Sequence, residues 1–278
     1  MNIQDIMMRF PSLSGIELIK AGGQKTVYSG VSTKFGPIVL KLMKGGARIE
    51  REINIVKSHC FTGVPAIYET GRLEGSDEFS MFIIEERIDG QDLKLCLAGH
   101  GGPMPTKFVV RMMMSILRTI CEIEAAQIVH RDIKPDNIVV DREGKFWLLD
   151  FGIARDVRDV SLTQTDALNG PCTPGYGAPE QVFNYKTQID SRTDLYSLGV
   201  TAYELLTGEN PFRRNVDNVF GAMVQSVTLE ASTLEIEGDT GGQFAQFIKM
   251  MMNKNKTFRP PNAKIALEVL ETIARSMT

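Results

Sequence analysis

One short stretch of the chain, from His130 to Asn137, places a carboxylate, an ammonium group and an amide close together. A second carboxylate, Asp150, follows in the tripeptide Asp-Phe-Gly. Transfer of a γ-phosphoryl group requires metal-holding carboxylate and amide oxygens, and one residue that orients the attacking hydroxyl. We therefore predict a phosphoryl-transfer site. Its catalytic residues are expected to be Asp132, Lys134 and Asn137.

This stretch resembles the catalytic loop and metal-binding turn of eukaryotic-type (Hanks-type) serine/threonine protein kinases. By that resemblance, Asp132 accepts or orients the hydroxyl proton, and Lys134 steadies the γ-phosphate. Asn137 and Asp150 would hold two metal ions. The resemblance implies ATP and Mg²⁺ as cofactors, with Mn²⁺ as an alternative metal. A polar turn with chance matches is the other interpretation, and eight consecutive matching residues disfavour it.

The N-terminal third is expected to form an antiparallel meander that holds the nucleotide. Strands are predicted over 16–20, 26–31 and 37–42, separated by glycine-containing turns. The first turn resembles the glycine-rich flap of kinases, although lysines stand in place of its first and third glycines, and an ordinary hairpin turn remains the alternative. The flap residues expected to contact ATP are Gly22, Gly23 and Val27.

Lys41 ends the string Ile38-Val39-Leu40-Lys41, which resembles the kinase strand whose lysine grips the α- and β-phosphates. A buried ammonium needs an anionic partner, because leaving it alone without water is costly. The partner is expected on a helix predicted over 47–58, where apolar residues recur at helical spacing. Glu52 is preferred over Glu50, on the resemblance of its neighbours to the family's helix C.

A strand pair is predicted over 66–72 and 80–87, followed by a segment that resembles the adenine-binding hinge. There Glu86 and Ile88 would offer backbone contacts. Glu85 falls where the family usually has a bulky apolar residue, so this carboxylate must find a donor or raise its pKa. Apolar walls around the adenine are expected from Ile19, Val27, Val39 and Val139, with simple core packing as the alternative for each.

Arg131, directly before Asp132, resembles the arginine of kinases whose activation segment is organised by a bound phosphate. The polar segment that follows Asp150 contains three hydroxyl residues, and autophosphorylation is expected at its two threonines above all. Thr173 begins a docking loop that ends in Ala178-Pro179-Glu180, and it is expected to bond Asp132 and Lys134. The regulatory residues are thus predicted to be Arg131, Ser161, Thr163, Thr165 and Thr173.

The rest of the chain is expected to be helical. Helices are predicted over 105–125, 190–208, 216–226, 243–252 and 262–275. Three further roles follow from the resemblance. Glu180 should form an interior ion pair with Arg259, and Asp194 should brace the catalytic loop. His130 should tie that loop to the Asp-Phe-Gly backbone rather than act as a general base.

The resemblance, which covers about residues 15 to 275, implies an α+β, bilobal protein-kinase-like fold. A small antiparallel-sheet lobe with one main helix is expected over 1–88, and a larger, mostly helical lobe over 89–278. The 278 residues include 31 basic and 34 acidic ones, so no electrostatic reason favours nucleic acid as a partner. No apolar run is long enough to span a membrane, and four widely separated cysteines fit a reducing cytoplasm.

The sequence therefore predicts a serine/threonine protein kinase acting on protein substrates, with a homodimer as a route to trans-autophosphorylation. Lys134, two residues after Asp132, favours serine and threonine over tyrosine. Two alternatives remain: a catalytically inert scaffold, suggested by the altered flap and by Glu85, and a small-molecule kinase. The Thr173–Glu180 docking loop disfavours the small-molecule kinase.

Overall fold

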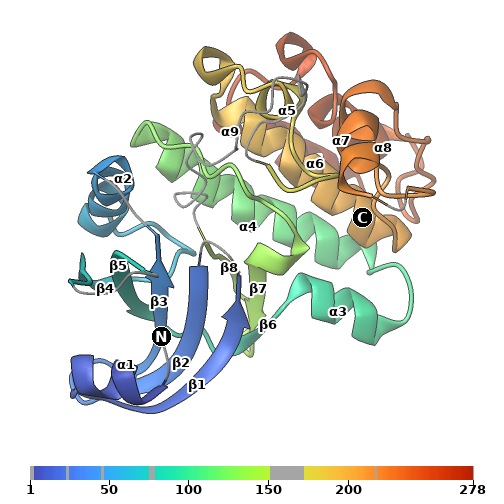
Figure 1. Cartoon of the computed structure of the whole chain (residues 1–278). Helices are drawn as coiled ribbons and strands as arrows, with labels where there is room; N and C mark the ends of the chain where they lie inside the picture. Colours follow the sequence, from blue (N-terminus) through green and yellow to red (C-terminus); the bar gives the residue numbers. More distant parts are fainter. Residues whose placement is uncertain are drawn as a thin grey trace. The chain divides into compact units, whose positions relative to one another are not determined.

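The computed structural model describes residues 3–22, 25–44, 47–74, 79–150, 172–216 and 218–277, except for the side chains of residues 47–49, 51, 52 and 55. Four predicted site residues lie outside this description: Gly23, Ser161, Thr163 and Thr165. The chain divides into two compact units, residues 1–89 and 90–278. Figure 1 labels their elements.

The first unit is built on a five-stranded antiparallel sheet in the order β1-β2-β3-β5-β4. Because strand side chains alternate between the two faces, neighbouring residues of β3 serve different purposes. Leu40 and Leu42 enter the apolar core on the outer face, whereas Lys41 points to the opposite face. The strands are β1 (Leu13–Ala21), β2 (Lys25–Ser32), β3 (Gly36–Met43), β4 (Ile67–Arg72) and β5 (Met81–Glu86).

A short N-terminal helix, α1 (Ile3–Arg9), covers part of the outer face of this sheet (Figure 1). Ile6 on this helix is completely buried, and Phe10 just after it packs edge-on against Phe82 of β5. The sequence predicts no element before residue 16, because seven residues are too few to establish a helical period. Helix α2 (Ala47–Ser58) has the bounds that the sequence predicted.

The second unit is mostly helical and contains a small sheet in the order β6-β7-β8 (Figure 1). Its long helix α4 (Thr106–Ala125) packs against α6 (Ser191–Thr207) and α9 (Ala263–Ser276). The predicted apolar face of α4 is fully buried from Val109 to Ile123, including Met112 and Met113. The remaining elements are β6 (Gly90–Asp92), α3 (Leu93–His100), η1 (Pro135–Asn137), β7 (Ile138–Asp141), β8 (Phe146–Leu148), α5 (Pro179–Val182), η3 (Lys186–Gln188), α7 (Val219–Thr228), α8 (Gln243–Met251) and η4 (Lys256–Phe258).

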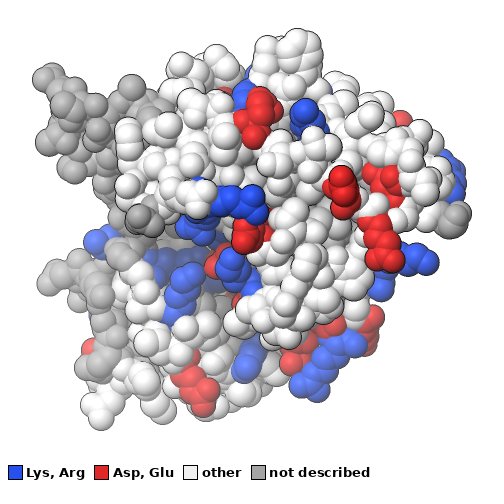
Figure 2. Space-filling model, turned by 90° about the vertical axis from the view of Figure 1, so that its right-hand side faces the viewer, with Lys and Arg blue, Asp and Glu red and all other residues white. Residues whose placement is uncertain are grey.

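Together the two units form the α+β fold expected from the sequence. The sequence missed the short elements α3 and β6 to β8, which lack a clear period, and its predicted helix over 216–226 lies at Val219–Thr228. Among the helices in the described ranges, none is both long enough and apolar enough to cross a membrane. On the face drawn in Figure 2, acidic and basic side chains are mixed.

Candidate active site

Helix α6 holds the backbone of the predicted catalytic loop through one buried carboxylate. Asp194 is fully buried and accepts hydrogen bonds from the backbone N–H of His130 at 2.7 Å and of Arg131 at 2.8 Å. Arg131 adopts a left-handed backbone with φ of 68°, which is uncommon for a residue with a side chain. The predicted bracing by Asp194 is confirmed, and it fixes a strained turn directly before Asp132.

His130 lies at the centre of the loop as a neutral, structural group. Its Nε2 lies 3.0 Å from the carbonyl oxygen of Leu149, and its Nδ1 accepts a hydrogen bond from the Asp132 backbone N–H at 3.3 Å. These contacts require the tautomer with its proton on Nε2. Burial lowers the pKa of His130 to about 4, although the nearby Asp132 carboxylate opposes this shift. The histidine thus ties the loop to the residue before Asp150.

The depressed pKa of His130 predicts a loss of stability in mild acid. Unfolding restores a pKa near 6.5, so the unfolded chain binds more protons as the pH falls below that value. From about pH 7.5 to about pH 5, this group should remove about 2 kcal/mol of unfolding free energy. Urea unfolding of wild type and His130→Asn, followed by the fluorescence of Trp147, measures the effect.

The stability difference between wild type and His130→Asn should shrink as the pH falls. Asp194 affects stability in the opposite sense, because burial raises its pKa to about 7. Since Asp194 is present in both proteins, its contribution to the stability difference cancels to first order. A difference that stays constant over this pH range would contradict the assignment of a neutral, buried His130.

Asp132 is the hub of the predicted catalytic residues. Its Oδ1 accepts from Thr173 Oγ1 at 2.6 Å, and its Oδ2 accepts from Lys134 Nζ at 2.8 Å and from Asn137 Nδ2 at 2.9 Å. Lys134 also donates to Thr173 Oγ1 at 2.9 Å. The expected contacts of Thr173 with Asp132 and Lys134 are therefore confirmed. The structure brings all four side chains into one hydrogen-bonded group.

Asn137 and Asp150 are suitable for holding a divalent cation. Both hydrogen bonds of the Asn137 side chain use its Nδ2, towards the carbonyl and the carboxylate of Asp132, so neither occupies its amide oxygen. The Leu149 N–H donates to the Asn137 carbonyl at 2.8 Å, which brings the backbone before Asp150 close to Asn137. Mg²⁺ is usually held by one or two protein oxygens together with phosphate oxygens and water, and this donor set fits it.

The predicted docking loop after Thr173 is anchored by α6 within the second unit. Buried Tyr176 donates to the carboxylate of Glu204, which also accepts from Lys94 at 2.9 Å. Ser197 donates to the Tyr176 carbonyl at 2.9 Å. Burial and the adjacent Glu204 raise the pKa of Tyr176, so its hydroxyl stays a donor. The side chain of Gln181 then joins this loop to the catalytic loop, donating to the Arg131 carbonyl at 3.0 Å.

A buried ion pair holds the end of this loop, where α5 begins. Arg259 donates to both carboxylate oxygens of Glu180, at 2.7 Å and 3.0 Å, and both side chains are buried. Thr193 donates to the same carboxylate at 2.8 Å. The predicted pair of Glu180 and Arg259 is confirmed.

In the first unit, the residues predicted to contact the nucleotide differ in how exposed they are. Val27 and Val39 lie on neighbouring strands, with Val27 buried and Val39 partly buried, whereas Ile19 is 57% exposed. Gly22 forms the turn between β1 and β2, where its N–H donates to the Lys25 carbonyl at 2.9 Å. In the second unit, Val139 lies buried in the middle of β7.

The predicted hinge segment begins where β5 ends. The Glu86 carboxylate accepts from the Ala66 N–H at 3.2 Å, and the Glu86 N–H donates to the Ala66 carbonyl at 2.8 Å. Ile88 follows outside any strand and is partly buried. The backbone N–H of Glu86 is therefore already hydrogen-bonded to Ala66. The backbone contacts of Glu86 and Ile88 with adenine stay predictions.

Sequence reasoning missed the partner that the structure gives to Lys41. Lys41 forms an ion pair with Glu85, and the two residues are only 6% and 9% exposed. The donor required by Glu85 is therefore the same lysine that was predicted to grip phosphates. The expected pairing of Lys41 with Glu52 stays a prediction, because the Glu52 side chain lies outside the described residues. Glu50, the weaker choice, pairs with Arg72 instead.

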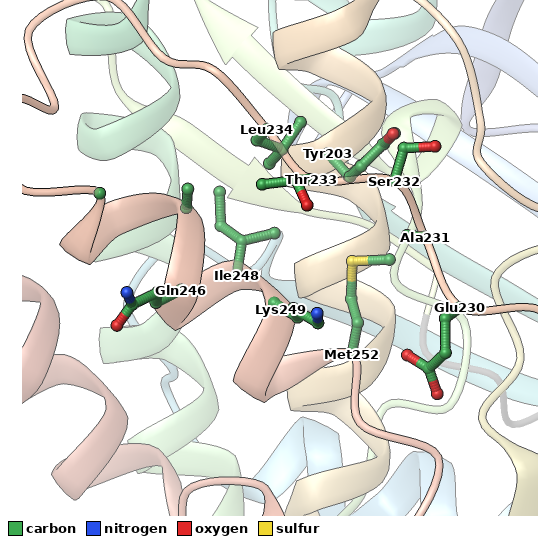
Figure 3. Close-up of a pocket in the computed structure, with 12 residues that line it drawn as sticks. Tyr203, Glu230, Ala231, Ser232, Thr233, Leu234, Gln246, Ile248, Lys249 and Met252 are labelled. Atoms are coloured by element: carbon green, nitrogen blue, oxygen red, sulfur yellow. The ribbon is translucent and has the colours of Figure 1, made fainter.

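A separate cavity of about 230 Å³ lies in the second unit, between α8 and the segment that follows α7 (Figure 3). Tyr203, Glu230, Leu234, Ile248, Lys249 and Met252 contribute to its lining. It contains none of the predicted site residues. The candidate active site is therefore defined by the catalytic loop and not by this cavity.

The fold belongs to the protein kinase-like class. It has the antiparallel-sheet unit, the helical unit and the loop centred on Asp132 that are typical of this class. The sequence pattern of the family described as "Protein kinase domain" matches residues 22–270. The chain belongs to this family.

Named relatives agree with this assignment. The chain is 36% identical over 203 residues to serine/threonine-protein kinase PknL of Mycobacterium tuberculosis, which covers 70% of the chain and 49% of that relative. It is 29% identical over 273 residues to the probable serine/threonine-protein kinase pknA2 of Bifidobacterium longum, which covers 93% of the chain and 34% of the relative. The chain thus spans half or less of the length of these relatives.

The fold also resembles a solved structure. The kinase domain of PknI from Mycobacterium tuberculosis superposes with a TM-score of 0.67 at 17% sequence identity, covering 95% of the chain and 97% of that domain. At this identity the likeness concerns the fold alone.

Proposed function

We propose that this chain is a serine/threonine protein kinase domain that transfers the γ-phosphoryl group of ATP to protein hydroxyls. One observation supports this most strongly: Asp132, Lys134, Asn137 and Thr173 form one hydrogen-bonded group, and the backbone of Asn137 bonds that of Leu149, the residue before Asp150. The relatives named serine/threonine-protein kinases support the same choice of hydroxyl.

Each residue then has a role in the transfer. Asp132 orients the substrate hydroxyl and accepts its proton, while Lys134 steadies the transferred phosphoryl group. Asn137 and Asp150 would hold Mg²⁺, or Mn²⁺ as the alternative, through oxygen atoms, and such an ion would supply positive charge to the phosphate oxygens. Lys41 holds the α- and β-phosphates. These roles make ATP and a protein substrate the two reactants.

We also propose that the activation segment is autophosphorylated, through a transient homodimer in which one copy acts on another. Arg131 supports this role, because its Nε is buried and has no hydrogen-bond partner among the residues described. A guanidinium binds phosphate well. Thr163 and Thr165 are the favoured acceptors, with Ser161 as the third. We propose the cytoplasm as the place of action, since the sequence shows no disulfide pattern.

Incubation of the purified chain with labelled ATP, Mg²⁺ and a generic basic protein tests the proposal. We expect phosphoserine and phosphothreonine, but no phosphotyrosine, in the acid-hydrolysed product. Mass spectrometry should find phosphate on the segment that includes Thr163 and Thr165. No transfer by the wild type would support an inert scaffold, and three unmodified hydroxyl residues in active protein would overturn the autophosphorylation.

A further inference from the structure

The ion pair between Lys41 and Glu85 is formed within a single sheet. In the antiparallel register of β3 and β5, Val39 lies opposite Glu85, and Lys41 lies opposite Ile83. Lys41 and Glu85 are therefore diagonal neighbours on one face, a spacing that long side chains can bridge. The register continues without a shift from Ile38 to Met43. The backbone of the sheet thus fixes both ends of the pair.

Helix α2 is attached differently. It is joined to β3 through residues 44–46, and its carboxylate Glu50 bonds Arg72 of β4 at 2.6 Å and 2.9 Å. Arg72 is well exposed, so this ion pair lies at the surface and holds the helix only weakly. The buried side chains of Ile53 and Val56 also hold α2. A carboxylate on α2 is therefore placed by the packing of the helix, whereas Glu85 is placed by the register of the sheet itself.

Because Lys41 is buried, the group that pairs with its ammonium affects how well it can bind a ligand. A lysine side chain has several freely rotating bonds, and fixing it before a ligand arrives lowers the cost of binding. Its ammonium group has three donors, so it can bond a carboxylate and phosphate oxygens at the same time. Without a nearby carboxylate, a buried ammonium loses a favourable interaction and turns towards water.

We propose that Glu85 is a positioning residue for Lys41, and that it sets the affinity for the nucleotide independently of where α2 lies. This inference rests on the proposed function, because it assigns Lys41 to the α- and β-phosphates. It also gives the unusual carboxylate at the position before the hinge a definite purpose. Control of activity through movements of α2 should then be weak in this chain.

Titration of the purified chain with ADP and Mg²⁺ tests the inference by calorimetry, because ADP contains both phosphates that Lys41 would hold. Glu85→Gln should weaken ADP binding about tenfold or more, as expected for a lost hydrogen bond to a charged group. Glu52→Gln should change it less than Glu85→Gln does, because the proposal fixes Lys41 through the sheet. In a Lys41→Met background, Glu85→Gln should have no further effect.

Two further variants separate positioning from damage to the fold. Glu69→Gln removes an exposed carboxylate from the neighbouring strand β4 and should leave ADP binding unchanged. Glu85→Asp keeps the charge and should retain most of the affinity even if Glu85→Gln unfolds. In steady-state assays, Glu85→Gln should raise KM for ATP more than it lowers kcat, which a general structural defect would not do.

Several outcomes would overturn the inference. These are tighter ADP binding by Glu85→Gln, an equal or larger loss for Glu52→Gln, an additive effect in the Lys41→Met background, and no ADP binding by the wild type. Failure of the wild type to phosphorylate any protein would instead contradict the proposed function, while the ADP titration would still decide the role of Glu85.

Discussion

Replacement of Asp132 by Asn should lower kcat about a thousandfold, the size expected when a positioned general base is lost. The amide has the same shape, but it offers one acceptor oxygen where Asp132 uses two, for Thr173 Oγ1 and for Lys134 Nζ. It also cannot take the proton of the substrate hydroxyl. The initial rate of transfer from labelled ATP to protein measures the loss.

The same loop offers a matched control. Asp136 is exposed, four residues further along, and Asp136→Asn makes the same chemical change at the surface. This variant should keep nearly wild-type kcat and stability. ADP affinity should be little changed in either variant, because the role proposed for Asp132 concerns the substrate hydroxyl and not the nucleotide. An Asp132→Asn protein that retains more than about a tenth of the wild-type rate would refute the role assigned to this carboxylate.

Replacement of Arg259 by Met should destabilise the second unit by about 3 to 5 kcal/mol, since it leaves a buried carboxylate without its partner. Glu180 is 4% exposed, and Arg259 is 3% exposed. Arg259 also donates to the backbone carbonyls of Arg192 at 3.0 Å and of Asn253 at 2.8 Å, so several buried groups lose a donor together. Urea unfolding measures the change.

The single tryptophan, Trp147, is a convenient probe because it lies in β8 of the second unit. Arg118→Met is the control: Arg118 bonds Glu271 at 3.0 Å, but both side chains are well exposed. That variant should lose less than about 1 kcal/mol. The double variant Glu180→Gln/Arg259→Met should recover part of the loss. Equal losses for the buried and the exposed arginine would contradict the interpretation.

The contacts among the proposed catalytic residues could be predicted from sequence, because these contacts are local or belong to a motif. Asp132, Lys134 and Asn137 lie within six consecutive residues, and the contact with Thr173 follows from a loop with many matching residues. The bounds of α2 were also predicted, since twelve residues are enough to show a helical period.

The partner of Lys41 could not be predicted in the same way. It depends on the register between β3 and β5, and that register is set by the folding of everything between Met43 and Met81. The only available signal was chemical: Glu85 is a carboxylate in an apolar strand and needed a donor. The resemblance to the kinase family directed attention to Glu52, whose pairing with Lys41 stays a prediction.

Helix α1 and the residues that follow it extend the folding unit of this domain towards the N-terminus. The family pattern starts at residue 22, yet the outer face of the first sheet is covered by Ile6, Phe10, Leu13 and Ile16. A shortened chain that starts at residue 22 would expose Ile38 and Leu40 to water, and an exposed apolar patch of this kind favours aggregation. For this protein, the folding unit begins before residue 22, where the match to the family pattern starts.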